Sequence, residues 1–375
     1  MEIAFIIMKH RHLILVLFML AQSLIAISQK EPLRLGIAGV THTHVHWLLG
    51  RKDTIGIKIV GIAEPNRDLA ERYAKQYGIS FEIIFPSLDE MIKATKPEAV
   101  AAFGSIYEHL KVVETAAPKG IHVMVEKPLA VSMDHARKME ALAKKHKIQL
   151  FTNYETTWYP TVHETKTMLQ KGEVGEIRKM IVRDGHKGPK NIGVNAEFLA
   201  WLTDPVQNGG GALIDFGCYG ANISTWMLDG KKPLSVTSIT QQFQPQNNPK
   251  VDDEATIVLT YDTTNVIIQA SWNWPWGRKD MEVYGTDGAI YADNRTQLRV
   301  RTATAKNEFS EKTYTLPERS PLFNDPFEQF AAIIRKEISL PNFDLSSLEN
   351  NMLVVEILDA ARESAKSGKT ILLPK

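Results

Sequence analysis

The sequence has almost no cysteine and no excess of charge. Cys218 is the one cysteine among 375 residues, so the chain cannot form an internal disulfide bond. Its 44 Lys and Arg residues nearly balance 43 Asp and Glu residues, which leaves a formal net charge of +1. That balance gives no indication of binding to nucleic acid or to a membrane surface. We therefore expect the partners to be small molecules or other protein chains.

Long hydrophobic runs are missing as well. The apolar segment Leu13–Leu20 is shorter than the roughly 18 residues that a membrane span requires. It follows the basic stretch from Met8 to His12 and precedes the small residues Ala26 and Ser28, the layout of a secretory signal peptide. We expect residues 1–28, with the signal proper at about 8–28, to be removed. No twin arginine and no lipidated cysteine accompany it, so the expected product is periplasmic or secreted, exported unfolded and free of the membrane.

A complete dinucleotide-binding glycine motif is also absent. The turn from Gly36 to His44 stands where G-x-G-x-x-G is expected, but Gly39 is the one glycine of that trio that remains. Thr41 holds the second glycine's place and His44 the third's, which crowds the approach to a pyrophosphate. Glu64 stands 25 positions after Gly39, where a carboxylate binds the adenosine ribose and favours NAD over NADP.

Two different patterns of strands divide the rest of the chain. Residues 31–153 alternate short apolar strands with amphipathic helices, which predicts a doubly wound parallel sheet of the Rossmann type. Residues 154–375 carry mostly alternating strands joined by turns, which predicts an α+β domain with a large, mostly antiparallel open sheet. Expected strands of the first half are 33–38, 57–63, 99–103, 121–125 and 150–153, and those of the second half are 177–184, 236–243, 255–261, 265–272, 281–284 and 298–300.

Lys127 is the strongest candidate for a catalytic cation. It ends the apolar strand beginning at Ile121, directly after Glu126, and Pro128 restricts its backbone to extended geometry. Ligands of open parallel sheets bind beyond the carboxyl ends of the strands. A strand-terminal lysine on the surface is the alternative reading on residue type alone.

A second candidate group follows the triple glycine 209–211. The sequence predicts one helix over 212–228, on which Asp215, Tyr219 and Asn222 stand at i, i+4 and i+7 and share a face. A carboxylate and a phenol on one face are suited to proton transfer. A solvated helix face fits the same spacing equally well.

His42, His44 and His46 alternate along the phosphate turn. His-x-His is metal-ligand spacing when the backbone is extended, and imidazole suits zinc, manganese or iron. No Cys, Asp or Glu stands nearby in sequence to complete a ligand shell. Metal binding by these turn residues is therefore the less favoured alternative. Contacts with phosphate or substrate are the favoured one.

Four segments together resemble the Gfo/Idh/MocA oxidoreductases. They are the dinucleotide-fold turn, the run 107–128 ending in Glu126-Lys127-Pro128, the run 209–219 with Asp215 and Tyr219, and Gly285-Thr-Asp-Gly288. Within the family, the sequence Asp-Phe-Gly-Cys-Tyr at 215–219 resembles the branch that contains glucose-fructose oxidoreductase and dihydrodiol dehydrogenase. The similarity spans nearly the whole chain after residue 33, and it implies a sugar or glycoside as substrate.

The resemblance implies roles for individual residues. Lys127 would polarise the reacting hydroxyl or carbonyl, and Tyr219 would be the acid/base with a proton affinity lowered by Lys127. Asp215 would orient the substrate or tune Lys127 and Tyr219. The expected cofactor contacts are Gly39, Thr41, His42, Glu64, His109 and Glu126. The expected substrate contacts are Asn153, Trp158, Arg183, His186 and Asn222.

Two functional hypotheses follow. In the first, an exported oxidoreductase holds its nicotinamide cofactor tightly, because free NAD is scarce outside the cytoplasm. In the alternative, the same scaffold is a metal-dependent or NAD-recycling hydrolase or lyase that uses His42, His44 and His46. An open antiparallel sheet exposes one face, so we also expect a homo-oligomer, a dimer or tetramer formed through the C-terminal sheet.

Overall fold

The structure is a computed structural model that describes residues 31–51, 56–305 and 308–374. The expected signal peptide lies outside the described residues. Among the helices of these segments, none combines the length and the apolar character that crossing a membrane would need. Residues Leu33–Lys375 form one compact unit that contains two sheets.

The first sheet has six parallel strands in the order β3-β2-β1-β4-β5-β6. Because β1 pairs with both β2 and β4, the strand order reverses beside β1 and leaves a crevice at its carboxyl end. The predicted doubly wound sheet is therefore confirmed. The strands are β1 (Leu33–Ala38), β2 (Ile57–Ala63), β3 (Ile84–Phe85), β4 (Ala99–Ala102), β5 (His122–Glu126) and β6 (Leu150–Asn153).

Local signals fix the helices between these strands. Asn66 caps α3 by accepting a hydrogen bond from the Leu69 amide at 3.1 Å, and Gly78 ends the helix with a positive φ of 66°. Ser132 caps α6 in the same way and directs Ala136 into the core. The helices are α2 (Val45–Leu49), α3 (Arg67–Tyr77), α4 (Leu88–Thr95), α5 (His109–Ala116) and α6 (Met133–His146).

The second sheet has nine strands in the order β14-β13-β12-β11-β7-β10-β9-β8-β15. Among the described strands of this second sheet, only β7 and β10 pair in parallel, so the expected mostly antiparallel sheet is confirmed. The sequence analysis missed β12, β14 and β15. The strands are β7 (Ile177–Gly185), β8 (Ser235–Gln241), β9 (Glu254–Thr260), β10 (Asn265–Ser271), β11 (Arg278–Gly285), β12 (Gly288–Ala292), β13 (Gln297–Ala303), β14 (Phe309–Thr315) and β15 (Ile371–Leu372).

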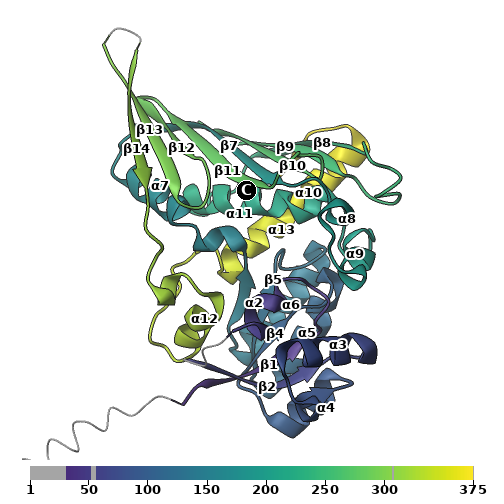
Figure 1. The fold of residues 1–375 in the computed structure, drawn as a ribbon. Helices are drawn as coiled ribbons and strands as arrows, with labels where there is room; N and C mark the ends of the chain where they lie inside the picture. The colour runs from purple at the N-terminus through teal and green to yellow at the C-terminus, as the bar shows by residue number, and fades with distance from the viewer. Residues whose placement is uncertain (1–30, 52–55, 306–307, 375) are drawn as a thin grey trace, which may run out of the picture. The chain divides into compact units, whose positions relative to one another are not determined.

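Helices cover one face of this sheet. Figure 1 shows α7, α11 and α13 along one side, and each contacts a strand there. Strand β9 accordingly alternates buried and half-buried residues along its length. The helices of this half are α7 (Pro160–Gln170), α8 (Pro189–Ile192), α9 (Ala196–Leu202), α10 (Ala212–Asp215), α11 (Gly217–Met227), α12 (Pro326–Ile334) and α13 (Leu348–Ser367).

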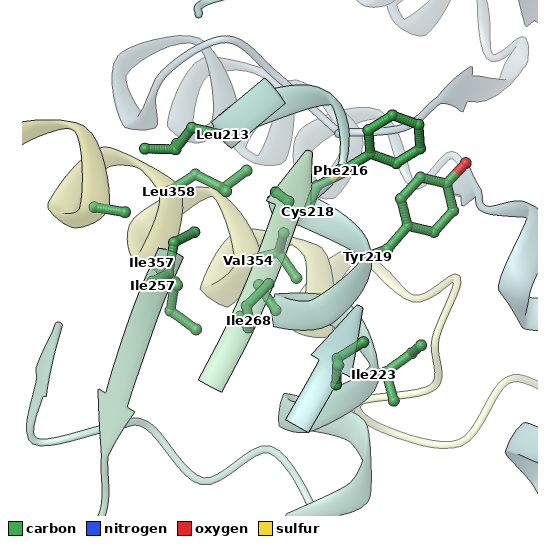
Figure 2. Packing of buried hydrophobic residues seen from close by; sticks show 14 of the residues in the cluster. Leu213, Phe216, Cys218, Tyr219, Ile223, Ile257, Ile268, Val354, Ile357 and Leu358 are labelled. Carbon is green, nitrogen blue, oxygen red and sulfur yellow. The ribbon is translucent and has the colours of Figure 1, made fainter. Parts of the chain in front are cut away.

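The helix that carries the second candidate group is not continuous. The predicted helix over 212–228 breaks at Phe216 into α10 and α11. Figure 2 shows the apolar cluster beneath it, where Ile268 of β10 and Val354 of α13 pack together. Gly220 lets α11 lie close against β10, because a Cβ at this position would meet Ile268 at 2.5 Å.

The expected domain boundary after Asn153 coincides with the end of β6, and the division into two domains remains a prediction.

Candidate functional site

Lys127 and Asp215 meet at the carboxyl end of β5. The Lys127 Nζ donates to the Asp215 main-chain carbonyl at 3.0 Å and forms an ion pair with the Asp215 carboxylate. The second Asp215 oxygen, Oδ2, accepts from the Trp272 indole at 2.9 Å. Lys127 precedes a cis peptide bond to Pro128. The two halves of the chain therefore join in one buried polar cluster.

Both members of this pair are charged. Burial opposes the charge on Lys127, but the Asp215 carboxylate outweighs it and the pKa of Lys127 lies above its ordinary value. Burial likewise opposes the charge on Asp215, and Lys127 with Trp272 brings the pKa of that carboxyl below its ordinary value. The expected contact of Asp215 with Lys127 is present. A permanent ammonium group stands at the strand end, where it can polarise an oxygen.

Tyr219 lies beside this pair, held by the apolar cluster. Its ring centroid is 5.1 Å from the Lys127 Nζ and 4.8 Å from the Lys279 Nζ. In Figure 2 the hydroxyl points away from the cluster. Burial, followed by the Glu155 carboxylate, raises the pKa of Tyr219 well above its ordinary value. The expected lowering by Lys127 is therefore wrong, because burial and surrounding carboxylates outweigh the nearby cations.

Glu155 and Lys279 complete the surroundings of Tyr219, and sequence reasoning missed both. Glu155 belongs to the 3-10 helix Glu155–Trp158, accepts from the Tyr159 hydroxyl at 2.6 Å and pairs with Lys279 of β11. Burial opposes ionisation, but Lys279 and Tyr159 bring the pKa of Glu155 down to about 2. The pairing of β11 with β7 puts Lys279 opposite Asp184. Strand register, which no local motif encodes, brings Lys279 to the site.

A cleft of about 740 Å³ opens next to this cluster. Its walls include Glu155, Lys279, Phe216 and His186, and Trp276 stands exposed at its edge. His186, an expected substrate contact, therefore lines the cleft, with its ring edge on Phe216 at a centroid distance of 4.9 Å. The wall is rich in charged and hydrogen-bonding groups, which suits a polyhydroxylated ligand.

Two expected substrate contacts lie elsewhere. Arg183 is on the open face of β7, where it pairs with Asp280 at 3.2 Å and Glu282 at 2.7 Å, because side chains alternate along a strand and Asp184 takes the helix-covered face. Asn222 is fully buried and donates to the Leu345 carbonyl at 2.7 Å. Both predictions are corrected: neither side chain is among those that line the cleft, although Asp280 and Glu282, the partners of Arg183, are.

Buried hydrogen bonds link three further expected contacts, Trp158, Asn153 and Glu126. The Trp158 indole donates to Asn153 at 3.1 Å, and Asn153 donates to Glu126 at 2.9 Å. Asn153 is fully buried and Trp158 is 3% exposed, so they hold Glu126 in place and do not line the cleft. That position corrects their expected role as substrate contacts.

The three histidines of the turn separate. His44 Nδ1 lies 2.8 Å from Glu126 Oε2, and His42 contacts His44 edge to face at 4.5 Å between centroids. His46 instead bonds Tyr77 through Nδ1 at 2.6 Å, away from the other two. Glu126 of β5 brings to this motif an acidic side chain that it lacks nearby in sequence. Of the three histidines named as alternative metal ligands, His42 and His44 group with Glu126, with potential ligand atoms within 4.8 Å of one another, and His46 does not.

A crevice of about 270 Å³ lies at the ends of β1, β2 and β4. Gly39, Ala63, Ala102 and Gly104 give it a small-residue floor, and His109 stands in its wall. Gly39 has φ of 72°, and a Cβ there would approach the Gly104 backbone to 3.0 Å. This cradle fits the adenosine part of a dinucleotide, and it explains why the first glycine of the motif remains.

The neighbouring residues complete the turn. Glu64 accepts from the Val40 amide at 2.9 Å and the Asn66 amide at 2.8 Å, and burial raises its pKa. Thr41 accepts from the Trp201 indole of α9 at 3.0 Å. The second half of the chain therefore covers the turn where two glycines are missing. Both carboxylate oxygens of Glu126, an expected cofactor contact, already interact with protein groups: Oε2 with the His44 ring and Oε1 with the Asn153 amide.

Family models match both halves of the chain. A model described as the NAD-binding Rossmann fold of the oxidoreductase family matches residues 33–154, and one described as the Gfo/Idh/MocA C-terminal domain matches residues 162–291. Together they cover well over half of the sequence. The chain belongs to the Gfo/Idh/MocA family of oxidoreductases. The prediction of NAD as the cofactor is confirmed at the level of the family.

Individual relatives are distant. Trans-1,2-dihydrobenzene-1,2-diol dehydrogenase of Xenopus laevis is 26% identical over 239 residues, which cover 62% of this chain and just under two thirds, 66%, of that enzyme. An inositol dehydrogenase homologue from Azotobacter vinelandii, solved with NAD+, aligns with a TM-score of 0.78 at 17% identity over 92% of this chain and 98% of that one. An aldose-aldose oxidoreductase from Caulobacter crescentus gives 0.74 at 18% identity, over 92% and 100%. The two structures share the fold of this chain.

Proposed function

We propose that this chain is an NAD-dependent oxidoreductase that acts on a hydroxyl or carbonyl carbon of a sugar or polyol. The observation that carries the proposal is the buried cluster of Lys127, Asp215 and Tyr219, which adjoins a polar cleft and shares the sheet edge with a crevice suited to adenosine. Relatives named for inositol, aldose and dihydrodiol substrates support this class of substrate.

The residues divide the chemistry between them. Lys127, held charged by Asp215, stabilises negative charge on the reacting oxygen. Tyr219 stays protonated because its pKa is raised, so it donates a proton to that oxygen more readily than it removes one. NAD, when bound, supplies or accepts the hydride at carbon. The cluster as it stands is therefore best prepared for the carbonyl-to-alcohol direction.

Glu155 and Lys279 position the substrate. Both line the cleft and flank Tyr219, so together they offer one acceptor and one donor to hydroxyl groups next to the reacting carbon. Because Lys279 already neutralises Glu155, the pair binds an uncharged polyol without leaving a buried charge unpaired.

We further propose that the protein is exported, holds its cofactor through each turnover and assembles through the open face of the nine-stranded sheet. Helices occupy the other face, and the half-buried Ile181, Val258 and Ile267 stand on neighbouring strands of the uncovered one. Coupled oxidation and reduction of two sugars, or transient oxidation during glycoside cleavage, would return the cofactor to its starting state.

The decisive experiment is to denature the purified chain and identify the released nucleotide. We expect close to one nicotinamide dinucleotide per chain, and turnover of sugars or polyols in a panel assay with NAD or NADH. Absence of released nucleotide together with no measurable NAD binding would refute the proposal. Analytical ultracentrifugation of the same sample tests the assembly, and processing of the first 28 residues in a bacterial host tests export.

A further inference from the structure

The phosphate turn and the end of β5 bring together a group of potential metal ligands that has no part in the proton transfer and charge stabilisation proposed for Lys127 and Tyr219. His42, His44 and Glu126 each place one potential ligand atom within 4.8 Å of the others. His42 is 2% exposed and Glu126 is 1% exposed, while the His44 side chain is 15% exposed. The group is therefore enclosed, with His44 as its most accessible member.

We propose that His42, His44 and Glu126 bind one divalent transition-metal ion, with Zn²⁺ as the best match. Two imidazoles and one carboxylate form a ligand set that catalytic zinc sites use, with a fourth position left for water or substrate. Calcium and magnesium prefer sets built mainly from oxygen, so two imidazoles disfavour them.

Neighbouring residues hold these ligands in place. Asn153 donates to Glu126 Oε1 at 2.9 Å, which leaves Oε2 directed at His44. His44 stacks on Trp47 at 3.8 Å between centroids, and His42 packs edge to face on Phe198 at 4.8 Å. Hydrogen bonds and packing around the ligands orient a metal site before the ion arrives.

Binding exchanges existing contacts for metal bonds. In the structure the His44 amide donates to His42 Nδ1 at 3.1 Å, and His44 Nδ1 is hydrogen-bonded to Glu126 Oε2 at 2.8 Å. An ion must displace the proton shared in the second contact and rearrange the first. In return it forms three bonds to the protein.

Charge balance indicates what the fourth position would hold. Glu126 offsets one of the two positive charges of the ion, and Lys127, the next residue, is already neutralised by Asp215. The remaining positive charge favours hydroxide or an anionic substrate oxygen in the open position. The site thus offers an electrophile whose ligands include the residue next to Lys127 in sequence.

The test measures metal binding by the full chain, prepared without a polyhistidine tag, stripped with a chelator and then reloaded with Zn²⁺ or Co²⁺ and freed of excess ion. We expect about one Zn²⁺ per chain by elemental analysis, and visible d–d absorption from the chain loaded with Co²⁺. His44→Ala and Glu126→Gln are expected to weaken Zn²⁺ binding about 100-fold or more, since changes even in residues behind a ligand cost 10- to 100-fold.

His46→Ala is the matched control. It removes an imidazole from the same motif, but that ring bonds Tyr77 and lies outside the ligand set, so metal binding should not change. Thermal unfolding of each variant establishes that it is folded, and Glu126→Gln, which keeps the side-chain shape, serves if His44→Ala unfolds. No metal uptake by the wild type, equal binding by His44→Ala, or an equal loss in His46→Ala would each overturn the proposal.

Discussion

The two ends of the site are built by different means. At the adenosine crevice, small neutral residues come close together, and Gly39 lies against Gly104 so that the backbone itself forms the surface. At the Lys127 end, buried charges from both halves of the chain are paired with one another. The first end selects its ligand by shape and the second by charge. A substitution at the first end should therefore disturb cofactor binding, and a substitution at the second end should disturb the chemistry.

Replacing Lys127 should have the largest effect. Lys127→Met removes the cation that stabilises the reacting oxygen, so we expect kcat/KM to fall by about 10³-fold. NAD affinity, measured by fluorescence titration, should stay nearly unchanged, because the adenosine crevice is intact. The loss must appear in chemistry and not in cofactor binding.

Lys166→Met is the control, because it makes the same replacement of a buried lysine by methionine away from the site. Lys166 is 8% exposed and donates to the carbonyl of Trp226 at 2.9 Å, at the far end of α11. We expect this variant to lose stability and to retain its catalytic rate. A similar fall in kcat/KM for both lysines would contradict a specific role for Lys127.

Gly39→Ala should damage the other end. A Cβ at φ of 72° is strained by about 1–2 kcal/mol, and it would also meet the Gly104 backbone at 3.0 Å. We expect NAD to bind roughly tenfold more weakly or worse, as measured by calorimetry. Gly78→Ala has the same strain at φ of 66° with nothing within 4 Å, so it should cost stability without changing NAD affinity. Equal effects in both variants would show that strain alone is responsible.

The same contrast separates what the sequence could and could not predict. Strand β2 and helix α3 follow from apolar periodicity and from Asn66 and Gly78, because these signals act within a few residues. The Lys127–Asp215 pair followed from the resemblance of two distant motifs. Glu155 and Lys279 could not be found in this way, since only the register between β7 and β11 brings Lys279 to the site.

Corrections arise from the same cause. The placement of Arg183 depended on which face of β7 meets the helices, and a shift by one residue reverses that face. The tuning of Tyr219 depended on burial and on Glu155, which neighbouring residues along the chain do not reveal. Contacts made far along the sequence decide both the direction of a side chain and its proton affinity.

His109 gives the crevice a dependence on pH. Burial lowers the pKa of His109 to about 4, whereas an unfolded histidine titrates near 6.5. Stability is therefore complete above about pH 6.5 and is lost as the pH falls toward 4, because only the unfolded chain takes up the proton in that window. The loss is of the order of 3 kcal/mol. His109→Gln should flatten the slope of unfolding free energy against pH, measured by urea denaturation.

His163 is the comparison outside the crevice. Burial, helped by Arg319, lowers its pKa to about 4 as well. His163→Gln should also reduce the pH dependence of stability, but only the His109 variant should alter NAD binding. If neither substitution changed the slope, the pH dependence would have to come from other groups.

The smallest effect is expected on the open face of the sheet. Arg183→Gln breaks the partly buried pairs with Asp280 and Glu282, which should cost about 1 kcal/mol of unfolding free energy. Because Arg183 itself is not among the residues that line the cleft, its kcat/KM should change less than that of a variant in the cleft wall. Lys279→Gln, on the neighbouring strand and in that wall, should lower kcat/KM roughly tenfold, because it loses a charged hydrogen-bond donor to the substrate. Steady-state kinetics and thermal unfolding of the two variants compare the faces directly. A kinetic defect in Arg183→Gln as large as that in Lys279→Gln would mean that Arg183 acts on the cleft through Asp280 and Glu282, which line it.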